Sequence, residues 1–334
     1  MNKELLKNTV AHLMSPGKGI LAADETPSNI GKKFAALHIE NTPENRQKYR
    51  EMLFTTLGME EYISGVILQD ETIYQRTKDG VSFPEYLKDK NILSGIKVDL
   101  GLEPISEGSQ ETITKGLDGL GERLEKYKKY SAKFAKWRSV IYIDSETCLP
   151  TEKAMQLNAK GLADYAYTCQ LHDIVPIVEP EVLMDGNHSI ETSYKVTSDI
   201  LDKLFKALVE KGVFLEGVLL KPNMVIPGLM CANQVDPGIV ANKTIQCFRE
   251  NVPAETSGIV FLSGGQRDDL SIKHLALMNQ HNDLPWKLSF SYGRALQRQA
   301  LTAWKGQDQN LQAAQKAFLE QARLNSLATL GQIY

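Results

Sequence analysis

The chain has 334 residues, with 38 Lys and Arg against 41 Asp and Glu, so its formal net charge at pH 7 is -3. This near balance argues against nucleic acid or an anionic membrane as the main partner, because both are bound through excess positive charge. Hydrophobic residues make up 42% of the chain, and no run approaches the ~20 consecutive apolar residues that span a bilayer.

The first predicted element is an amphipathic helix over residues 3–14. An acidic residue, Glu4, lies among the first residues, where a secretory signal peptide carries basic ones. The N-terminal sequence therefore does not resemble a signal peptide, and we expect a cytoplasmic protein.

Eight short apolar runs follow, each ending in polar or charged residues. Continuous apolar runs are typical of strands that are buried on both faces. The runs cover residues 19–24, 64–70, 95–99, 138–144, 174–181, 215–221, 258–263 and 287–291. Stretches of helical period lie between them, for example over 43–57, 111–133, 152–170 and 192–211.

Eight strand–helix repeats predict a (β/α)8 TIM barrel, which typically needs about 250 residues. The remaining length is assigned to the N-terminal helix, a longer connection over 75–94 and C-terminal helices ending at Tyr334. No Ser-, Gly- or Pro-rich linker divides the chain, so we predict one domain over residues 1–334. The alternative is a doubly wound open sheet, but its usual G-x-G-x-x-G motif is absent after the first strand.

The most informative residue is Lys221, which ends the sixth apolar run directly before Pro222. A lysine is normally protonated at neutral pH, but burial or a second cation nearby favours the neutral, nucleophilic amine. The alternative is a lysine that reaches from a strand end into solvent. Lys97 shares a strand face with Asp99, so it could provide that second cation or form a buried Lys–Asp pair.

Carboxylates end several other strands, notably Asp24, Glu179 and Glu181. In a barrel, the carboxyl ends of the strands meet on one face, where active sites form. Two neighbouring carboxylates cannot both ionise freely, so the pair around Pro180 predicts a residue that acts as acid and base. The alternative is a pair of surface acids.

Small residues follow the last two strands: Ser263 and Gly264 after the seventh, and Ser291, Gly293 and Arg294 at and after the eighth. Small residues let backbone N–H groups approach an anion, and barrels often bind phosphate at these two loops. An arginine can hold a phosphate through two hydrogen bonds. Each motif alone is more often a plain turn, but together they indicate a phosphorylated substrate.

Neither the six histidines nor the four cysteines have the spacing of metal ligands, and the cysteines suggest no disulfide framework. Cleavage of a carbon–carbon bond beside a carbonyl needs an electron sink, which is either a metal or an iminium. Lys221 without metal ligands indicates an iminium, so we expect no metal and no cofactor.

Seven stretches of the chain resemble the class I (Schiff-base) fructose-bisphosphate aldolases. They are residues 16–25, 95–99, 135–138, 174–181, 215–224, 261–266 and 290–296. The resemblance implies reversible cleavage of fructose 1,6-bisphosphate into dihydroxyacetone phosphate and glyceraldehyde 3-phosphate, in glycolysis and gluconeogenesis. It also implies a homotetramer.

The resemblance implies that Lys221 forms the Schiff base, that Glu179 is the acid and base, and that Asp24 orients or deprotonates the substrate hydroxyl. Lys136 and Arg138 would contact the reacting chain and its phosphate end. The strand pattern disagrees at one point: a fourth strand over 138–144 leaves Lys136 at the end of the barrel away from the site.

The same resemblance implies the phosphate contacts. Glu181 would support the lysines, and Lys97 would face the second phosphate. The phosphate beside the keto carbon would be held by Ser263, Gly264, Ser291, Gly293 and Arg294. The second phosphate would be held by Thr26, Asn29 and Lys33.

The chain also departs from the family. Thr26-Pro27-Ser28-Asn29 stands where a Ser/Thr-Gly-Ser/Thr segment is usual, and Lys33 stands where an arginine is usual. Preference for the bisphosphate over fructose 1-phosphate therefore stays open. So does the role of Tyr334, since the family uses a tyrosine at the end of a longer tail for proton exchange.

Two alternatives to this function remain. One is another Schiff-base barrel enzyme, such as a transaldolase-like transferase or a sugar-phosphate aldolase of different specificity. The other is a catalytically silent sugar-phosphate binder or scaffold, since fold alone does not determine function. The combination of Asp24, Lys136, Glu179 and Lys221 argues against the binder, which has no need of a nucleophilic lysine with acid and base partners.

Overall fold

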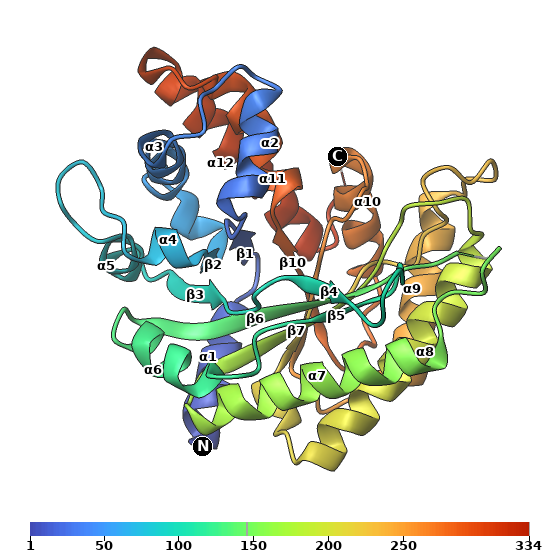
Figure 1. Cartoon of the computed structure of the whole chain (residues 1–334). Helices are drawn as coiled ribbons and strands as arrows, with labels where there is room; N and C mark the ends of the chain where they lie inside the picture. The colour runs from blue at the N-terminus through green and yellow to red at the C-terminus, as the bar shows by residue number, and fades with distance from the viewer. Residues whose placement is uncertain (145, 334) are drawn as a thin grey trace.

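Eight parallel strands close into a barrel in the computed structural model, which describes residues 1–144 and 146–333 (Figure 1). The barrel strands are β1 (Gly19–Ala22), β2 (Ile63–Leu68), β3 (Leu93–Lys97), β6 (Ala132–Ile141), β7 (Val175–Val182), β8 (Leu219–Leu220), β9 (Gly258–Phe261) and β10 (Lys287–Tyr292). Since β1 pairs with both β2 and β10, the sheet has no edge. The predicted (β/α)8 barrel is confirmed.

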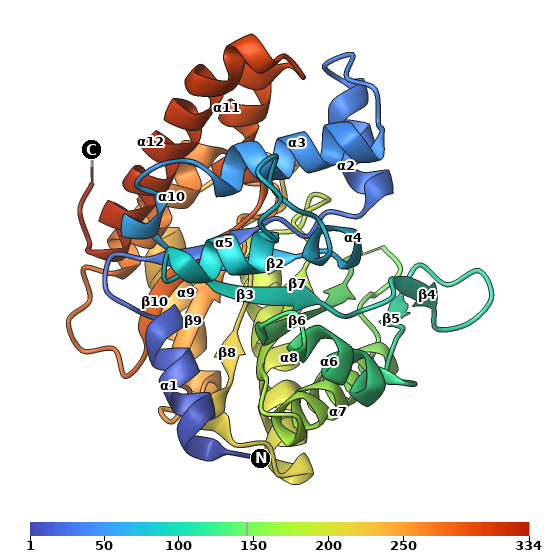
Figure 2. The same cartoon turned by 90° about the vertical axis from the view of Figure 1, so that its left-hand side faces the viewer.

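Helices surround this barrel (Figure 2). They are α1 (Lys3–Leu13), α2 (Pro27–Ala35), α3 (Pro43–Phe54), α4 (Asp70–Ile73), α5 (Phe83–Asp89), α6 (Leu120–Lys128), α7 (Glu152–Leu171), α8 (Ile190–Lys211), α9 (Pro237–Asn251), α10 (Asp268–Met278), α11 (Arg294–Trp304) and α12 (Leu311–Thr329). Short 3-10 turns form η1 (Met59–Glu61), η2 (Leu215–Gly217) and η3 (Asp308–Asn310), and a hairpin pairs β4 (Leu102–Pro104) with β5 (Thr112–Thr114).

The N-terminal and C-terminal helices are present as predicted, with α12 ending at Thr329, while Tyr334 lies outside the described residues. Sequence caps explain several helix starts. For example, the Thr42 hydroxyl accepts a hydrogen bond from the Asn45 N–H at 3.1 Å, and Pro43 takes the first helical position. No helix in the described ranges combines the length and hydropathy of a bilayer-spanning segment.

The prediction of one helix over 111–133 is wrong. This segment contains β5, the shorter helix α6 and the first residues of β6. The helical period holds only within α6, because the residues before it pair with β4 and because Ser131 adopts a left-handed backbone (φ 63°) that turns the chain into β6.

The predicted start of the fourth barrel strand is also wrong. The strand begins at Ala132 rather than at residue 138. Lys133, Lys136 and Arg138 interrupt the apolar run, so a search for continuous apolar residues misses its first half. Lys136 and Arg138 both lie within β6. The family resemblance, not the strand pattern, therefore placed Lys136 correctly.

The barrel interior is filled by a cluster of buried apolar side chains, which is separate from the larger core between the barrel and the helices. The side chains of Leu6, Val10, Leu13 and Met14, in and just after α1, pack against interior strand residues. Those strand residues are Ile20, Ala22, Ile67, Phe134, Val175, Ile177, Leu219 and Val260. Because α1 packs against this interior cluster, it closes the end of the barrel where the strands begin (Figure 1).

Gly95 lies against the Phe134 ring, and we predict that this close approach cannot accommodate a methyl group. A Cβ on Gly95 would lie 2.2 Å from the ring, so Gly95→Ala should lower the free energy of unfolding by about 1–3 kcal/mol. Urea denaturation measures this change.

Two further variants make the test specific. Adding Phe134→Leu to Gly95→Ala should recover part of the loss by opening space. Gly161→Ala in α7, where a Cβ meets nothing within 4 Å, should not destabilise the protein, because alanine is the better helix former. Unchanged stability of Gly95→Ala would contradict the packing described here.

Candidate active site

A cavity of about 250 Å³ opens at the carboxyl end of the barrel strands. Every site residue named from the sequence lines it: Asp24, Thr26, Asn29, Lys33, Lys97, Lys136, Arg138, Glu179, Glu181, Lys221, Ser263, Gly264, Ser291, Gly293 and Arg294. Ala22, Glu25 and Leu262 complete the lining. The fold thus brings together residues that are up to 270 positions apart, as Asp24 and Arg294 are.

The charged residues of this cavity form a layer directly above the apolar interior of the barrel. Side chains two positions apart on a strand share a face. Accordingly, Lys136 follows Phe134, Glu179 follows Ile177 and Lys221 follows Leu219. Lys136, Glu179 and Lys221 are each 4% exposed, so their charges must be compensated by one another.

Lys136 lies at the centre of this layer. Its Nζ is 2.8 Å from Asp24 Oδ2, 3.3 Å from Glu179 Oε2 and 3.9 Å from Asp99 Oδ2. Burial lowers the pKa of Lys136, but the three carboxylates outweigh this effect and hold the pKa well above its usual value. Lys136 is therefore a permanent cation.

Lys221 has a different environment. Its Nζ is 3.1 Å from Glu179 Oε1, and Glu179 is its one ion-pair partner among residues 1–144 and 146–333. Proline at position 222 and the hydrogen bond from the Lys221 N–H to the Val178 carbonyl at 2.8 Å fix the backbone. Lys221 thus has one carboxylate within ion-pair distance in the described ranges, whereas Lys136 has three.

Asp24 lies just beyond β1. Burial raises its pKa, but the charges of Lys136 and Lys221 outweigh burial and hold the pKa well below the usual range for an aspartate. Asp24 is therefore a stable carboxylate beside the two lysines.

Lys97 forms the Lys–Asp pair that was one of its two predicted roles. Its Nζ lies 2.6 Å from Asp99 Oδ1 and also donates to the Asp99 backbone carbonyl at 2.7 Å. The cation that shares a carboxylate with Lys221 is Lys136, which contacts Glu179. Lys97 still lines the cavity.

Glu179 and Glu181 each have a cation of their own. Glu179 lies between Lys136 and Lys221, and Glu181 accepts a hydrogen bond from Arg138 Nε. The sequence pattern predicts only the repulsion between these two carboxylates. In the structure, each of them also contacts at least one cation. Glu179 is the carboxylate in contact with the candidate nucleophile.

The loops after β9 and β10 line the cavity with backbone groups and an arginine. Helix α11 begins at Arg294, and its preceding residue, Gly293, provides no side-chain cap. The Leu296 and Gln297 N–H groups donate to the Gly293 carbonyl. An anion at this helix start would therefore bind the N–H groups of Arg294 and Ala295. Gly264 has φ +52° and packs so closely on Met184 that a Cβ would lie 2.3 Å from the methionine methyl group. Ser263 and Ser291 add hydroxyl groups to the lining.

The loop after β1 and the start of α2 also line the cavity. The Thr26 hydroxyl accepts a hydrogen bond from the Asn29 N–H at 3.3 Å and caps this helix. Lys33 Nζ lies 2.6 Å from Glu25 Oε1, and Arg50 lies 2.7 Å from Glu25 Oε2. Burial raises the pKa of Glu25, but Arg50 and Lys33 hold it below its usual value.

Glu25 and Arg50 of this arrangement were not among the predicted site residues, and Asp99 was predicted only as a strand-end residue and possible partner of Lys97. Glu25 and Asp99 are next to, or share a strand face with, residues that were predicted, so position could have found them. Arg50 lies in α3 and is 2% exposed. Nothing in its local sequence distinguishes it from an exposed helix arginine.

Asp70 ends the second apolar run but is not part of the cavity lining. It accepts hydrogen bonds from Tyr127 Oη at 2.8 Å and Tyr74 Oη at 3.3 Å. Asp70 therefore makes structural hydrogen bonds to a tyrosine of α6 and to the tyrosine that follows α4.

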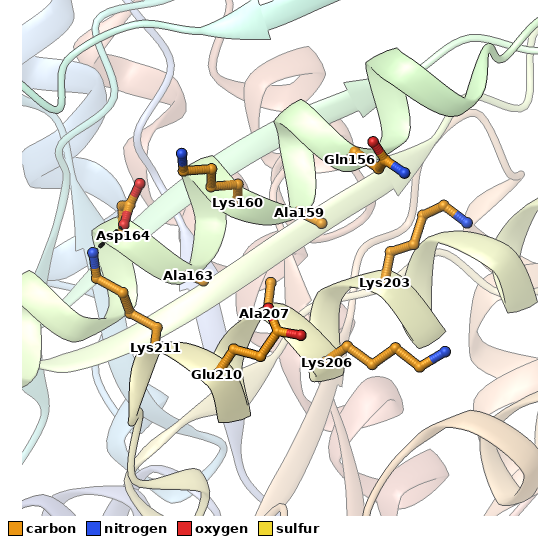
Figure 3. A pocket seen from close by; sticks show the side chains of 10 residues that line it. All are labelled: Gln156, Ala159, Lys160, Ala163, Asp164, Lys203, Lys206, Ala207, Glu210 and Lys211. Carbon is orange, nitrogen blue, oxygen red and sulfur yellow. Dashed lines mark ion pairs between the residues drawn. The ribbon is translucent and has the colours of Figure 1, made fainter.

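A larger hollow of about 580 Å³ lies outside the barrel between α7 and α8, and none of the predicted site residues lines it (Figure 3). Its lysines mostly have acidic partners; for example, Lys211 Nζ is 2.5 Å from Asp164 Oδ1. Ala159, Ala163 and Ala207 line it as well. Size alone would select this hollow, but of the two linings only that of the smaller cavity contains buried charged residues, namely Lys136, Glu179 and Lys221.

Comparisons with known proteins identify the family to which the chain is similar. A sequence model of the family "Fructose-bisphosphate aldolase class-I" matches residues 4–334. A protein of Xanthomonas campestris pv. campestris named probable fructose-bisphosphate aldolase class 1 is 51% identical over 332 residues, which cover 99% of each chain. Fructose-bisphosphate aldolase 4, cytosolic, of Arabidopsis thaliana is 49% identical over 98% of this chain and 83% of its own length.

A solved structure is also similar. It is the fructose-bisphosphate aldolase of Plasmodium falciparum, in a ternary complex with TRAP and a small-molecule inhibitor. The TM-score is 0.97 at 46% sequence identity, and the match covers 99% of this chain and 95% of that chain.

Removing the central cation should strongly destabilise the protein. Lys136→Met leaves Asp24, Asp99 and Glu179 buried with too few cations, so we predict a loss of about 3–5 kcal/mol in the free energy of unfolding at pH 7. Urea denaturation measures it. The exposed Lys160→Met should change stability by less than about 0.5 kcal/mol.

The loss should depend on pH in a defined direction. The pKa of folded Asp24 is depressed, so its ionised form stabilises the native state above the ordinary aspartate pKa of about 3.9, and this contribution is lost as the pH falls below that value. The difference between wild type and Lys136→Met should shrink between pH 5 and pH 3. A constant difference would contradict an electrostatic origin.

Proposed function

The chain belongs to the class I fructose-bisphosphate aldolase family, and we propose that Lys221, Glu179, Asp24 and Lys136 carry the family's reaction here. The protein is a metal-independent lyase that cleaves fructose 1,6-bisphosphate reversibly through a Schiff base. The products are dihydroxyacetone phosphate and glyceraldehyde 3-phosphate.

The observation that carries the assignment is the contrast between the two buried lysines. Lys136 is held as a cation by three carboxylates, whereas Lys221 has only Glu179 within ion-pair distance in the described part of the chain. A nucleophilic amine must first lose its proton. Because Lys136 is held as a cation, Lys221 is assigned as the nucleophile, and Glu179, 3.1 Å from its Nζ, is placed to take its proton.

The chemistry then proceeds in balanced steps. The neutral Lys221 amine attacks the keto carbon, and loss of water, with a proton returned by Glu179, leaves an iminium. The bond between the α-carbon and the hydroxyl-bearing β-carbon then breaks, its electron pair forms the carbon–carbon double bond of an enamine, and the C=N electron pair moves to the nitrogen. Glu179, which became a carboxylate in the dehydration, takes the hydroxyl proton as the aldehyde leaves. The remaining enamine takes up a proton and is hydrolysed to the second product and free Lys221.

Asp24 is better suited to orienting the substrate hydroxyl than to accepting its proton. Its pKa is depressed by Lys136 and Lys221, and a carboxylate with a low pKa is a weak base. Lys136 provides a fixed positive charge near the oxygens that become more negative as the carbon–carbon bond breaks.

Two groups of lining residues suit the two phosphates of the substrate. We assign the phosphate beside the keto carbon to Ser263, Gly264, Ser291, Gly293 and Arg294, and the second phosphate to Thr26, Asn29, Lys33, Lys97 and Arg138.

Three wider properties are part of the proposal. Pairing of β1 with β10 joins the two halves of the sequence, which supports a single domain over residues 1–334. The name of the cytosolic Arabidopsis relative supports a cytoplasmic location. The family resemblance supports a homotetramer.

The first experiment traps the covalent intermediate. The protein is incubated with dihydroxyacetone phosphate and borohydride in the presence of EDTA, and its peptides are mapped by mass spectrometry. We expect a reduced adduct on the peptide containing Lys221, and none for Lys221→Met. A folded wild-type protein without an adduct would favour the silent binder, and cleavage that requires an acceptor aldehyde would favour a transaldolase-like transferase.

We also predict that Lys33 selects for the bisphosphate. Lys33→Met should lower kcat/KM for fructose 1,6-bisphosphate about tenfold, because a charged contact to the second phosphate is lost. Turnover of fructose 1-phosphate should change less than about twofold. The neighbouring exposed Lys32→Met removes the same charge outside the cavity and should leave both rates unchanged. Equal losses on both substrates would contradict the assignment.

A further inference from the structure

Arg294 differs from most buried or half-buried arginines of this protein. The guanidinium groups of Arg50, Arg138 and Arg46 each contact a carboxylate, namely Glu25, Glu181 and Glu71. In the described ranges the Arg294 side chain has one hydrogen-bond partner, the backbone carbonyl of Gln266. No carboxylate in the described ranges therefore neutralises its charge, and the orientation of its guanidinium group depends on the single hydrogen bond to the Gln266 carbonyl oxygen.

Gln266 is itself held from several sides. Its N–H donates to the Ser263 carbonyl at 3.1 Å, which closes the turn that contains Gly264. Its side-chain oxygen, Oε1, lies 2.7 Å from His274 Nδ1, and its side-chain nitrogen, Nε2, lies 3.5 Å from Met224 Sδ. Gln266, His274 and Met224 are at most 4% exposed.

These contacts determine the orientation of both polar groups. A methionine sulfur can only accept a hydrogen bond, so the NH2 group of Gln266 must face Met224 and its oxygen must face His274. The imidazole must then carry its proton on Nδ1 and donate it. Burial, with the nearby charge of Lys273, lowers the pKa of His274 to about 4, so the ring is neutral at pH 7.

We propose that His274 is a positioning residue for the phosphate beside the keto carbon, acting through Gln266 on Arg294. The proposal rests on the proposed function. Without the imidazole donor, the buried Gln266 oxygen has no partner, and the side chain must turn to find one. Such a turn disturbs the peptide that holds both Arg294 and the Ser263–Gly264 turn.

The position of His274 makes this role possible. It lies in α10, one element after the Ser263 turn, and makes no part of the cavity lining. The start of α10 is fixed to α11 separately, because Arg298 holds Asp268 with hydrogen bonds of 3.0 and 2.7 Å. Loss of the imidazole donor therefore leaves the two helices joined and acts on the Ser263–Gly264 turn, which precedes α10.

The test uses two substitutions of His274 in the full-length protein. His274→Leu keeps an apolar side chain of similar size but removes the donor, whereas His274→Asn keeps an N–H donor near the position of Nδ1. Borohydride trapping of the Schiff base is measured against dihydroxyacetone phosphate concentration. This gives the half-saturating concentration and the maximal yield of adduct on Lys221.

For His274→Leu, we expect the half-saturating concentration to rise about tenfold with the maximal yield unchanged. His274→Asn should stay within about twofold of wild type. The KM for fructose 1,6-bisphosphate should follow the same order, with kcat preserved. His281→Leu, a substitution beyond the end of α10 and outside the cavity lining, controls for the loss of a histidine as such.

Three outcomes would overturn the proposal. They are wild-type affinity in His274→Leu, equal loss of affinity in the Leu and Asn variants, and a lower unfolding temperature with no change in affinity. Failure of the proposed function looks different, because the wild-type protein itself would then form no adduct on Lys221.

Discussion

The site depends on one constraint: its charged side chains lie directly above the buried apolar residues of the barrel interior, where bulk water has no access. Three lysines and three carboxylates lie above the interior residues of the barrel. They are Lys97, Lys136 and Lys221, and Asp24, Asp99 and Glu179. Buried charges this close must balance, since unpaired ions are costly where water cannot reach them. Two lysines of equal burial therefore differ in their surroundings: Lys136 has three carboxylates within ion-pair distance, and Lys221 has one in the described ranges.

The barrel produces this arrangement through two simple periodicities. Side chains alternate along each strand, and parallel pairing sets neighbouring strands in register, so that Lys97 pairs with Lys136 and Arg138 pairs with Glu179. A one-residue slip in β6 would turn Lys136 and Arg138 outward together. The close contact between Phe134 and Gly95, one layer below, opposes such a slip. Packing beneath the site thus maintains the chemistry above it.

The sequence predicted features that depend on local pattern, and missed features that depend on distant contacts. Eight buried strands and the residues at their ends follow from apolar runs and their boundaries. The first half of β6 was missed because Lys133, Lys136 and Arg138 look like surface charges until the barrel mouth is known to receive them. Arg50 and the contact between His274 and Gln266 leave no local signal, because each partner lies in another element and only the fold brings the two together.

The N-terminal helix closes the barrel, and this has a consequence for the order of synthesis. The Asn2 N–H donates to Asp173 Oδ1 at 2.6 Å, and Lys7 pairs with Glu216, so the docking surface of α1 is made long after α1 itself. At about 5–20 residues per second, a ribosome needs roughly 10 to 40 s to reach Glu216. During that interval the apolar face of Leu6, Val10 and Leu13 lacks those partners that come later in the chain, such as Leu219 and Val260, so chaperones can bind it on the nascent chain.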